Sequence, residues 1–436
     1  MDSSVGWWSY WRMRLKSGFL RNVVTLATGT TIAQIIPILA SPILSRLYTP
    51  EDYGLMALYS SVAGLLGIMA TGMYAQAVIL AKDDREAANL IALAASITVG
   101  FSLVVTVVMV VFHEAFVGML RNPAISPWLY LVPMSILLGG LLQGLTNWSN
   151  RKQQYKRLAT NRVAGSVTGT GVQLAAGVAR IGAGGLILGL LSGLGVSTGL
   201  LGGRVVKEDR AALKLASFAG MRQAARGYRR FPIYVLPTEF INVAINQVPI
   251  FVLNTLANTA SVGFYGMTQR VMGLPSTLIA NSITDVFKQR AASDYLRDGN
   301  CREIYVKTFK LLLALAIIPF SVLFTFGPQL FGLVFGQEWA PAGEYARYLS
   351  IMFFFGFISS PLSYVYFIAG RQREDLMLHI YMAFSTLAAL VLGYLIFREA
   401  RYMILCFSLN YSLIYLIYLV RSYQFSGGST TRDNSA

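Results

Sequence analysis

The chain has 436 residues, of which 55% are hydrophobic and only 13% are charged. Soluble proteins carry about 25% charged residues, so this composition excludes a soluble globular protein and predicts a membrane protein. The net charge of +16 does not indicate nucleic-acid binding, because the Lys and Arg residues lie in short loops between apolar runs.

Apolar runs recur along the whole chain, and each is long enough, at roughly 20 residues, to cross a bilayer. Backbone polar groups inside a bilayer must be satisfied within the segment, so we predict helices rather than barrel strands. The fifth, sixth and eighth runs are the least apolar. The sequence thus predicts an all-α polytopic membrane protein with twelve transmembrane helices at 22–45, 54–80, 88–112, 127–147, 160–180, 183–203, 231–254, 260–284, 308–334, 346–369, 376–397 and 402–420.

The longest connection between these helices is basic and falls at the midpoint of the chain, which divides it into two six-helix lobes. The expected parts are a cytoplasmic or interfacial N-terminal segment at 1–21, a first lobe at 22–203, a basic cytoplasmic linker at 204–230, a second lobe at 231–421 and a disordered cytoplasmic tail at 422–436.

A weak internal repeat supports two related halves. An offset of 209 residues aligns Gly54 with Gly263, and it places Ser61 opposite Arg270. Parallel repeats of this kind are a known transporter plan, in which the substrate site lies between the halves. We therefore expect two lobes around a central cavity. The other identities at this offset are Val62 with Val271, Gly64 with Gly273, and Leu65 with Leu274.

The distribution of basic residues predicts the orientation in the membrane. Of the 36 Lys and Arg residues, 29 fall in one set of loops and 6 in the other, and Arg270 lies inside a predicted helix. Loops rich in Lys and Arg stay on the cytoplasmic side. We expect both termini in the cytoplasm.

The first predicted helix carries a polar stripe, in which Thr28, Thr31 and Gln34 recur every three residues. Such a stripe either forms hydrogen bonds between helices in lipid or lines a polar cavity, and both alternatives stay open. Arg46 ends this helix on the expected outer side. There it is either a phosphate contact or an interfacial Arg whose stem lies along the lipid.

The seventh and eighth predicted helices contain the charged residues that a bilayer disfavours. Glu239, Asn242 and Asn246 are spaced by three and four, which places them on one face of the seventh helix. Arg270 lies at mid-depth in the eighth helix. A central Arg costs roughly 2.5–3.5 kcal/mol on insertion scales, so it should face a polar cavity or a partner.

Two interpretations of Arg270 stay open, and they are not exclusive. In the first, Arg270 and Glu239 form a buried ion pair that holds two helices in register. In the second, Arg270 lines a cavity and binds an anionic group, while Glu239 adjusts its charge or carries a proton.

No catalytic or metal-binding pattern accompanies these residues. The two His are isolated, and Cys301 and Cys406 are too few to hold a zinc ion. We predict no enzymatic activity, no cofactor and no metal.

Four stretches of the chain resemble a known family. They are "GTTIAQIIPILASPILSRLYTPEDYG", "YRRFPIYVLPTEFINVAINQVPIFVL", "VGFYGMTQRVMGLPSTLI" and "FGQEWAPAGEYARYL". They resemble the bacterial polysaccharide and O-antigen (Wzx-like) flippases of the multidrug/oligosaccharidyl-lipid/polysaccharide (MOP) exporter superfamily. The similarity runs from about residue 20 to 422.

This resemblance implies a flippase that moves an undecaprenyl-diphosphate-linked oligosaccharide, by alternating access, from the inner to the outer leaflet of the bacterial cytoplasmic (inner) membrane. It implies polysaccharide polymerase and chain-length regulator proteins as partners. It places Arg270 against the diphosphate, whose oxygens match the fork of a guanidinium. Glu239 departs from the family pattern, in which a neutral residue is expected at this position. The resemblance therefore does not decide which ion, if any, drives transport. The expected substrate-binding residues are Arg270, Arg46, Asn242, Asn246, Gln34, Thr28 and Thr31.

Two other classes of protein compete with this interpretation. A drug or ion exporter of related fold would need a cavity centred on a carboxylate rather than on an Arg. A membrane enzyme of polysaccharide assembly would need a large outer loop for its active site, and the predicted outer loops are all short.

Overall fold

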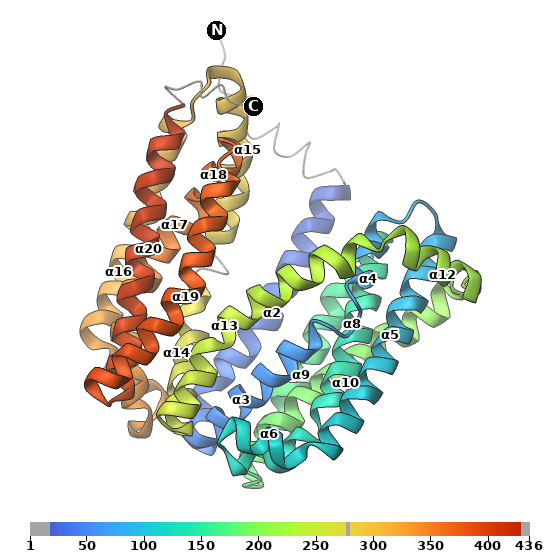
Figure 1. Ribbon diagram of the computed structural model, residues 1–436, viewed down its shortest axis with the longest axis horizontal. Coiled ribbons are helices and arrows are strands. Elements are labelled where there is room, and N and C mark those ends of the chain that lie inside the picture. The colour runs from blue at the N-terminus through green and yellow to red at the C-terminus, as the bar shows by residue number, and fades with distance from the viewer. Residues whose placement is uncertain (1–17, 276–279, 429–436) are drawn as a thin grey trace. The chain divides into compact units, whose positions relative to one another are not determined.

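The computed structural model describes residues 18–275 and 280–428, and every regular element in these ranges is a helix (Figure 1). The all-α prediction is therefore confirmed. The expected N-terminal segment up to residue 17 and the end of the expected tail, from 429 onward, lie outside the described residues.

All twelve predicted segments are mainly helical where they are described. Among the described residues, eight helices are long and apolar enough to cross a membrane, or nine if Pro123–Leu129 and α8, which are bent by 50° relative to each other, count as one span. The helical part of the predicted segment 54–80 is too short to count as a span, because α3 ends at Gly67 and a run of turns follows. The helix in the segment 260–284 is too short because α14 ends at Pro275. The segment 160–180 falls short because α9 is rich in Gly and Thr.

The described residues divide into two compact units that differ from the expected lobes. The first unit comprises 18–48 and 55–247, and the second comprises 49–54 and 248–428. Both α3 and α13 therefore contribute to both units. The lobe limits given by the sequence stay a prediction.

The first unit is an assembly of helices whose tightest packing is made by glycines. On α9, Gly165 and Gly169 face Gly193 and Gly189 of α10, and a Cβ atom added to any of the four would lie 2.7–3.0 Å from a carbonyl oxygen across the interface. The glycine-rich sixth predicted helix thus serves close packing, as small residues do in membranes. The elements are α2 (Gly18–Leu47), α3 (Pro50–Gly67, in part), α4 (Tyr74–Ala77), η1 (Val78–Leu80), α5 (Asp84–Val111), α6 (His113–Leu120), η2 (Pro123–Ile125), α7 (Ser126–Leu129), α8 (Val132–Arg151), α9 (Tyr155–Val178), α10 (Ala183–Glu208), α11 (Arg210–Leu213), α12 (Phe218–Gly227), η3 (Phe231–Val235) and α13 (Leu236–Leu256, in part).

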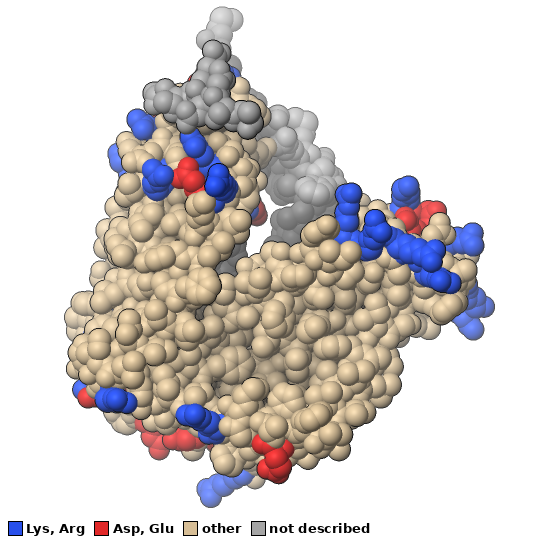
Figure 2. Space-filling view, viewed as in Figure 1, with Lys and Arg blue, Asp and Glu red and all other residues tan. Residues whose placement is uncertain are grey.

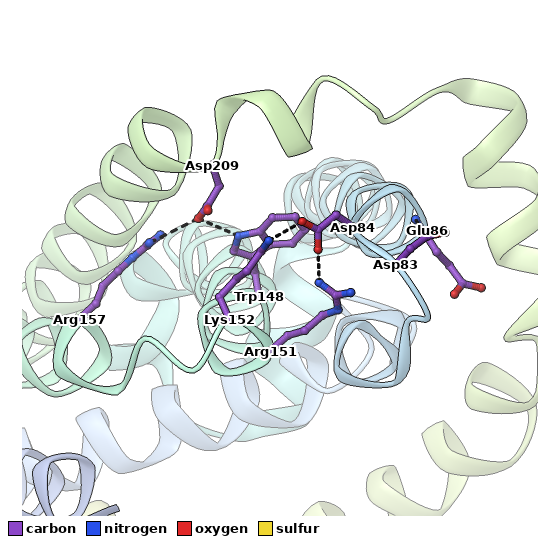
Figure 3. A network of polar contacts seen from close by, with 8 residues as sticks. All are labelled: Asp83, Asp84, Glu86, Trp148, Arg151, Lys152, Arg157 and Asp209. Carbon is purple, nitrogen blue, oxygen red and sulfur yellow. Dashed lines mark hydrogen bonds and ion pairs between the residues drawn. The ribbon is translucent and has the colours of Figure 1, made fainter. Parts of the chain in front are cut away.

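A polar network ties the expected cytoplasmic ends of α5, α8, α9 and α10 together (Figure 3). Asp209, which follows α10, accepts a hydrogen bond from the indole nitrogen of Trp148 (3.0 Å) and pairs with Arg157 at 3.4 Å. Asp84 in the first turn of α5 pairs with Arg151 and Lys152, both at 2.5 Å. Several basic residues that indicated the orientation thus also hold this end of the unit together.

The second unit contains long helices interrupted by proline. Pro328 in α16 has no amide hydrogen for the carbonyl of Phe324 one turn earlier. Arg347 of α17 replaces that donor, because its Nε donates to the Phe324 oxygen (3.0 Å) and its Nη2 to the Thr325 oxygen (3.2 Å). The elements are the remainder of α3 and α13, α14 (Thr259–Pro275), α15 (Asn281–Asp298), α16 (Arg302–Phe335), η5 (Gln337–Trp339), α17 (Ala340–Leu362), α18 (Val365–Ile368), α19 (Gln372–Phe397) and α20 (Ala400–Ser426).

The beginnings of α3 and α14 cross in contact within the second unit, and the contact is reciprocal. A Cβ atom on Gly54 would overlap the carbonyl oxygen of Thr259 and lie 2.8 Å from its carbon. A Cβ atom on Gly263 would overlap the carbonyl oxygen of Pro50 and lie 2.9 Å from its carbon. Gly54 with Gly263, and Pro50 with Thr259, are related by the same offset of 209 residues that the sequence repeat gave.

The end of α20 corrects the expected tail. The helix continues to Ser426, so residues 422–426 are helical rather than disordered. Ser422 and Ser426 are fully buried, and the amide of Cys301 donates to the Ser426 oxygen at 2.7 Å. The polar composition of this stretch hid its packing against the start of α16.

Candidate functional site

Arg270, the central candidate, is the twelfth residue of α14 and is half-buried. The adjoining face of α14 packs on α17, because Thr268 Oγ1 donates to the Ala342 oxygen (2.9 Å) and the ring of Phe264 meets the edge of Trp339. At 100° per residue, Arg270 lies about 200° around the helix from Thr268. Its side chain therefore leaves α14 on the face opposite to the packed one.

The surroundings of Arg270 within the second unit do not neutralise it. Its guanidinium interacts electrostatically with Tyr53, whose ring packs edge-on against Trp339 at 5.0 Å. Among the described residues of this unit, no carboxylate lies within 4.0 Å of the guanidinium. Within the described part of this unit, Arg270 therefore has no acidic partner.

Glu239, Asn242 and Asn246 lie on α13 in the part that belongs to the first unit. Glu239 is half-buried, whereas Asn242 and Asn246 are exposed, and Asn246 Nδ2 donates to the Asn242 oxygen at 2.8 Å. Glu239 and Arg270 therefore belong to different units, and their ion pair stays a prediction.

The polar stripe of α2 lies away from the neighbour of this helix. The contacts of α2 with α9 include Gly29, beside Ala159, the Thr30 hydroxyl, which accepts from Arg162, and the Ala33 oxygen, which accepts from Ser166 Oγ. Thr28, Thr31 and Gln34 lie about 140–260° around the helix from Gly29. None of the three hydrogen-bonds to a described residue. They are exposed, half-buried and exposed, respectively.

Arg46 lies at the other end of α2 and is exposed. Its Nη1 donates to the Pro42 oxygen at 2.6 Å, which satisfies a carbonyl near the helix end. This contact fits the interfacial interpretation of Arg46, and a phosphate contact stays a prediction.

The sequence did not single out a second polar group, which belongs to the first unit. Gln76, Gln143 and Asn147 line a groove of about 720 Å³ between α4 and α8. Asn147 Nδ2 donates to the Ala75 oxygen (3.0 Å), and Gln143 accepts from Thr71 Oγ1 (3.2 Å). The spacing of four between Gln143 and Asn147 indicates that they share one face of α8. Nothing in the sequence indicates the turns after α3 that bring Gln76 to α8. Within the described ranges, no three His, Cys, Asp or Glu residues gather as metal ligands.

Comparison with known proteins gives the family. Residues 43–344 match the family described as "Polysaccharide biosynthesis protein".

The chain belongs to the polysaccharide biosynthesis protein family.

Among curated relatives of this family member, the succinoglycan biosynthesis transport protein ExoT of Rhizobium meliloti (strain 1021) is 23% identical over 330 residues. The match covers 74% of this chain and 63% of ExoT, so this chain spans less than two thirds of that relative.

Solved structures show the fold of this family member. The lipid II flippase MurJ in an inward closed conformation superposes with a TM-score of 0.70 at 14% identity, over 92% of this chain and 90% of that one. An inward-facing MATE multidrug transporter gives 0.60 at 15% identity, over 92% and 93%. A MOP transporter from Pyrococcus furiosus gives 0.60 at 13%, over 92% and 95%. This member of the polysaccharide biosynthesis family therefore shares the fold of these three proteins, and the apolar helices of its described residues make it a multi-pass membrane protein.

Proposed function

We propose that this protein is a flippase for an undecaprenyl-diphosphate-linked oligosaccharide and moves it from the inner to the outer leaflet of a bacterial cytoplasmic membrane. The observation that carries the proposal is Arg270, which is half-buried, lies within α14 and has no carboxylate beside it among the described residues of its own unit. A diphosphate supplies the anion that this guanidinium lacks.

The remaining candidates fit the sugar and the transport cycle. Thr28, Thr31 and Gln34 offer polar side chains on α2 that no described residue engages, and Asn242 and Asn246 offer exposed amides on α13. Such groups form hydrogen bonds with sugar hydroxyls. Glu239 either pairs with Arg270 or carries a coupling ion.

The relatives support this class of cargo. ExoT is named for transport in succinoglycan biosynthesis, and MurJ is named as a flippase of lipid II. By extension, we propose that the protein acts without catalysis and beside the polymerase and chain-length regulator of its pathway. Both termini are cytoplasmic in this proposal.

The test is complementation of a deletion strain, with the sidedness of the lipid-linked oligosaccharide as the readout. Deletion should leave the intermediate facing the cytoplasm. A hydrogen bond to a charged group contributes about 1.5–3 kcal/mol, so Arg270→Ala should slow flipping about 10- to 100-fold. Arg270→Lys should rescue in part because it keeps the charge. Arg290→Ala removes an exposed Arg of α15 and is the control.

Normal flipping by Arg270→Ala at native expression would reject the role of this residue. To separate the ion pair from anion binding, Glu239→Gln, Arg270→Gln and the double variant are compared for stability and for transport. An ion pair predicts that the double variant is more stable than either single variant. Anion binding predicts that both Arg270 variants lose transport whatever residue 239 is.

The competing class is a drug or ion exporter of the same fold. Extrusion of cationic dyes that survives Arg270→Ala and fails on Glu239→Gln would favour that exporter over the flippase.

A further inference from the structure

Two cavities of the first unit meet beneath the basic linker. The first has a volume of about 400 Å³ and lies between α5, α8 and α10, with Leu213 and Ala216 of the linker against one end. The second has a volume of about 500 Å³ and lies between the start of α5 and α12. Ala88 and Ala216 line the first, and their neighbours in the chain, Asn89 and Ser217, line the second. The two cavities thus share a wall.

The first cavity is apolar. Ala92, Ala95 and Leu141 contribute to its walls, and Thr198 is the one hydroxyl-bearing residue among those that line it. That hydroxyl already donates to the Leu138 oxygen at 3.1 Å. A cavity without free polar groups does not hold water well and accepts an apolar ligand instead.

The second cavity is polar, and two cations and two carboxylates line it. Its two carboxylates are engaged at the start of α5, since Asp83 accepts from the Glu86 amide and Glu86 accepts from the Lys82 amide, both at 2.7 Å. Lys82 and Arg85 are exposed and pair with no carboxylate in the described part of the chain.

The linker adds further positive charge around this cavity. Eight basic residues lie between Arg204 and Arg230, against two acidic ones. Both acidic residues, Glu208 and Asp209, are paired with Arg157. In Figure 2 the Lys and Arg side chains gather at the α12 end of this unit. The α12 helix is fixed there, because Asn89 accepts from the Ser217 amide at 2.9 Å and Gly220 abuts its side chain.

We propose that these cavities hold one acidic phospholipid, with an acyl chain in the apolar cavity and its anionic head group at Lys82 and Arg85. The excess of positive charge in the linker around the second cavity favours an acidic head group, because basic regions at the cytoplasmic ends of membrane helices bind anionic lipids. The occupant is a resident lipid and not the transported one, since none of the candidate substrate residues on α2, α13 or α14 lines either cavity. The proposal does not depend on the identity of the cargo.

The test is native mass spectrometry of the full-length protein, delipidated in detergent and titrated with phosphatidylglycerol or phosphatidylcholine. Phosphatidylglycerol should bind more tightly. A basic residue near an anionic lipid contributes about fivefold in affinity, so the double variant Lys82→Ala/Arg85→Ala should weaken phosphatidylglycerol about 25-fold and leave phosphatidylcholine unchanged. The double variant Arg290→Ala/Arg373→Ala removes the same charge from the second unit and should have no effect.

The acyl-chain half is tested by filling the apolar cavity. Ala92→Phe should weaken both lipids, and Ala95→Leu is the smaller filling if the first variant does not fold. Val104→Phe on the exposed face of α5 is the control. Equal affinity for the two lipids, equal loss in the control variants, or no loss in the filled ones would overturn the proposal. Displacement of phosphatidylglycerol by equimolar undecaprenyl phosphate would assign the cavities to the cargo and overturn it as well.

Discussion

The crossing of α3 and α14 predicts opposite effects for chemically identical substitutions. Gly54→Ala and Gly263→Ala place a methyl group against backbone of the partner helix, which cannot rotate away. The added methyl group of Gly54→Ala would overlap the Thr259 oxygen and lie 2.8 Å from the Thr259 carbon, so the helices must separate by at least about 0.7 Å. Overpacking of this kind costs about 1–3 kcal/mol, less the 0.5–1 kcal/mol that Ala gains over Gly in a helix.

The same helices supply matched controls. Gly64 of α3 and Gly273 of α14 are related by the same offset of 209 residues, and an added Cβ atom at either would meet no heavy atom within 4 Å. Their Ala variants should gain about 0.5–1 kcal/mol from helix propensity alone. The propensity gain is common to both sets, so the contact variants should unfold about 2–12 °C below their controls, at about 2–4 °C per kcal/mol.

The assay is thermal unfolding in detergent, reported by a thiol-reactive dye, since Cys301 is buried and becomes available on unfolding. The double variant Gly54→Ala/Gly263→Ala should cost less than the sum of the single variants, because one separation of the helices accommodates both methyl groups. Equal melting temperatures for Gly54→Ala and Gly64→Ala would refute the close crossing, and strict additivity would refute its reciprocity.

Two further predictions concern the expected cytoplasmic side. Asp209→Ala leaves the buried Arg157 with Gln154 and Glu208 and removes the acceptor of Trp148, so it should destabilise by about 3 kcal/mol. Asp209→Asn can still accept from the indole and should cost less. Thermal unfolding measures both, and equal losses would contradict this account. Burial, with a smaller contribution from Asp294, raises the pKa of the Cys301 thiol to about 11. In a Cys406→Ala background, maleimide labelling of Cys301 should therefore be slow at pH 7.5 and should accelerate as the pH rises toward 11. Rapid labelling of the folded protein at pH 7.5 would contradict this raised pKa.

The sequence predicted the positions and order of the helical segments because hydropathy acts locally. A run such as 88–112 must be helical in lipid whatever surrounds it. The limits were less accurate where other forces act, since α20 continues past the apolar segment to Ser426 on account of buried serines. The break after Gly67 was missed because its turns form in an apolar stretch.

The sequence predicted a residue of the candidate site only where that residue alone has a high free-energy cost in a membrane helix. Arg270 was found because a guanidinium within a membrane helix is expensive in isolation. Contacts between distant positions left no local signal. Asp209 and Trp148 are 61 residues apart in the chain, and nothing near either residue indicates the other. The polar groove lined by Gln76 and Gln143 was not predictable for the same reason, because it depends on the path of the chain after α3.

The contribution of Thr49–Gly54 to the second unit has a genetic consequence. Each half presents its own glycine to the other half's backbone, and that exchange is the signature of an isologous interface between two identical subunits. A fused pair of once-separate six-helix chains would show this pattern. If the gene were divided within the linker, the C-terminal polypeptide would lack Thr49–Gly54, which packs against Gly263. The two polypeptides should therefore be stable when they are expressed together and degraded when either is expressed alone.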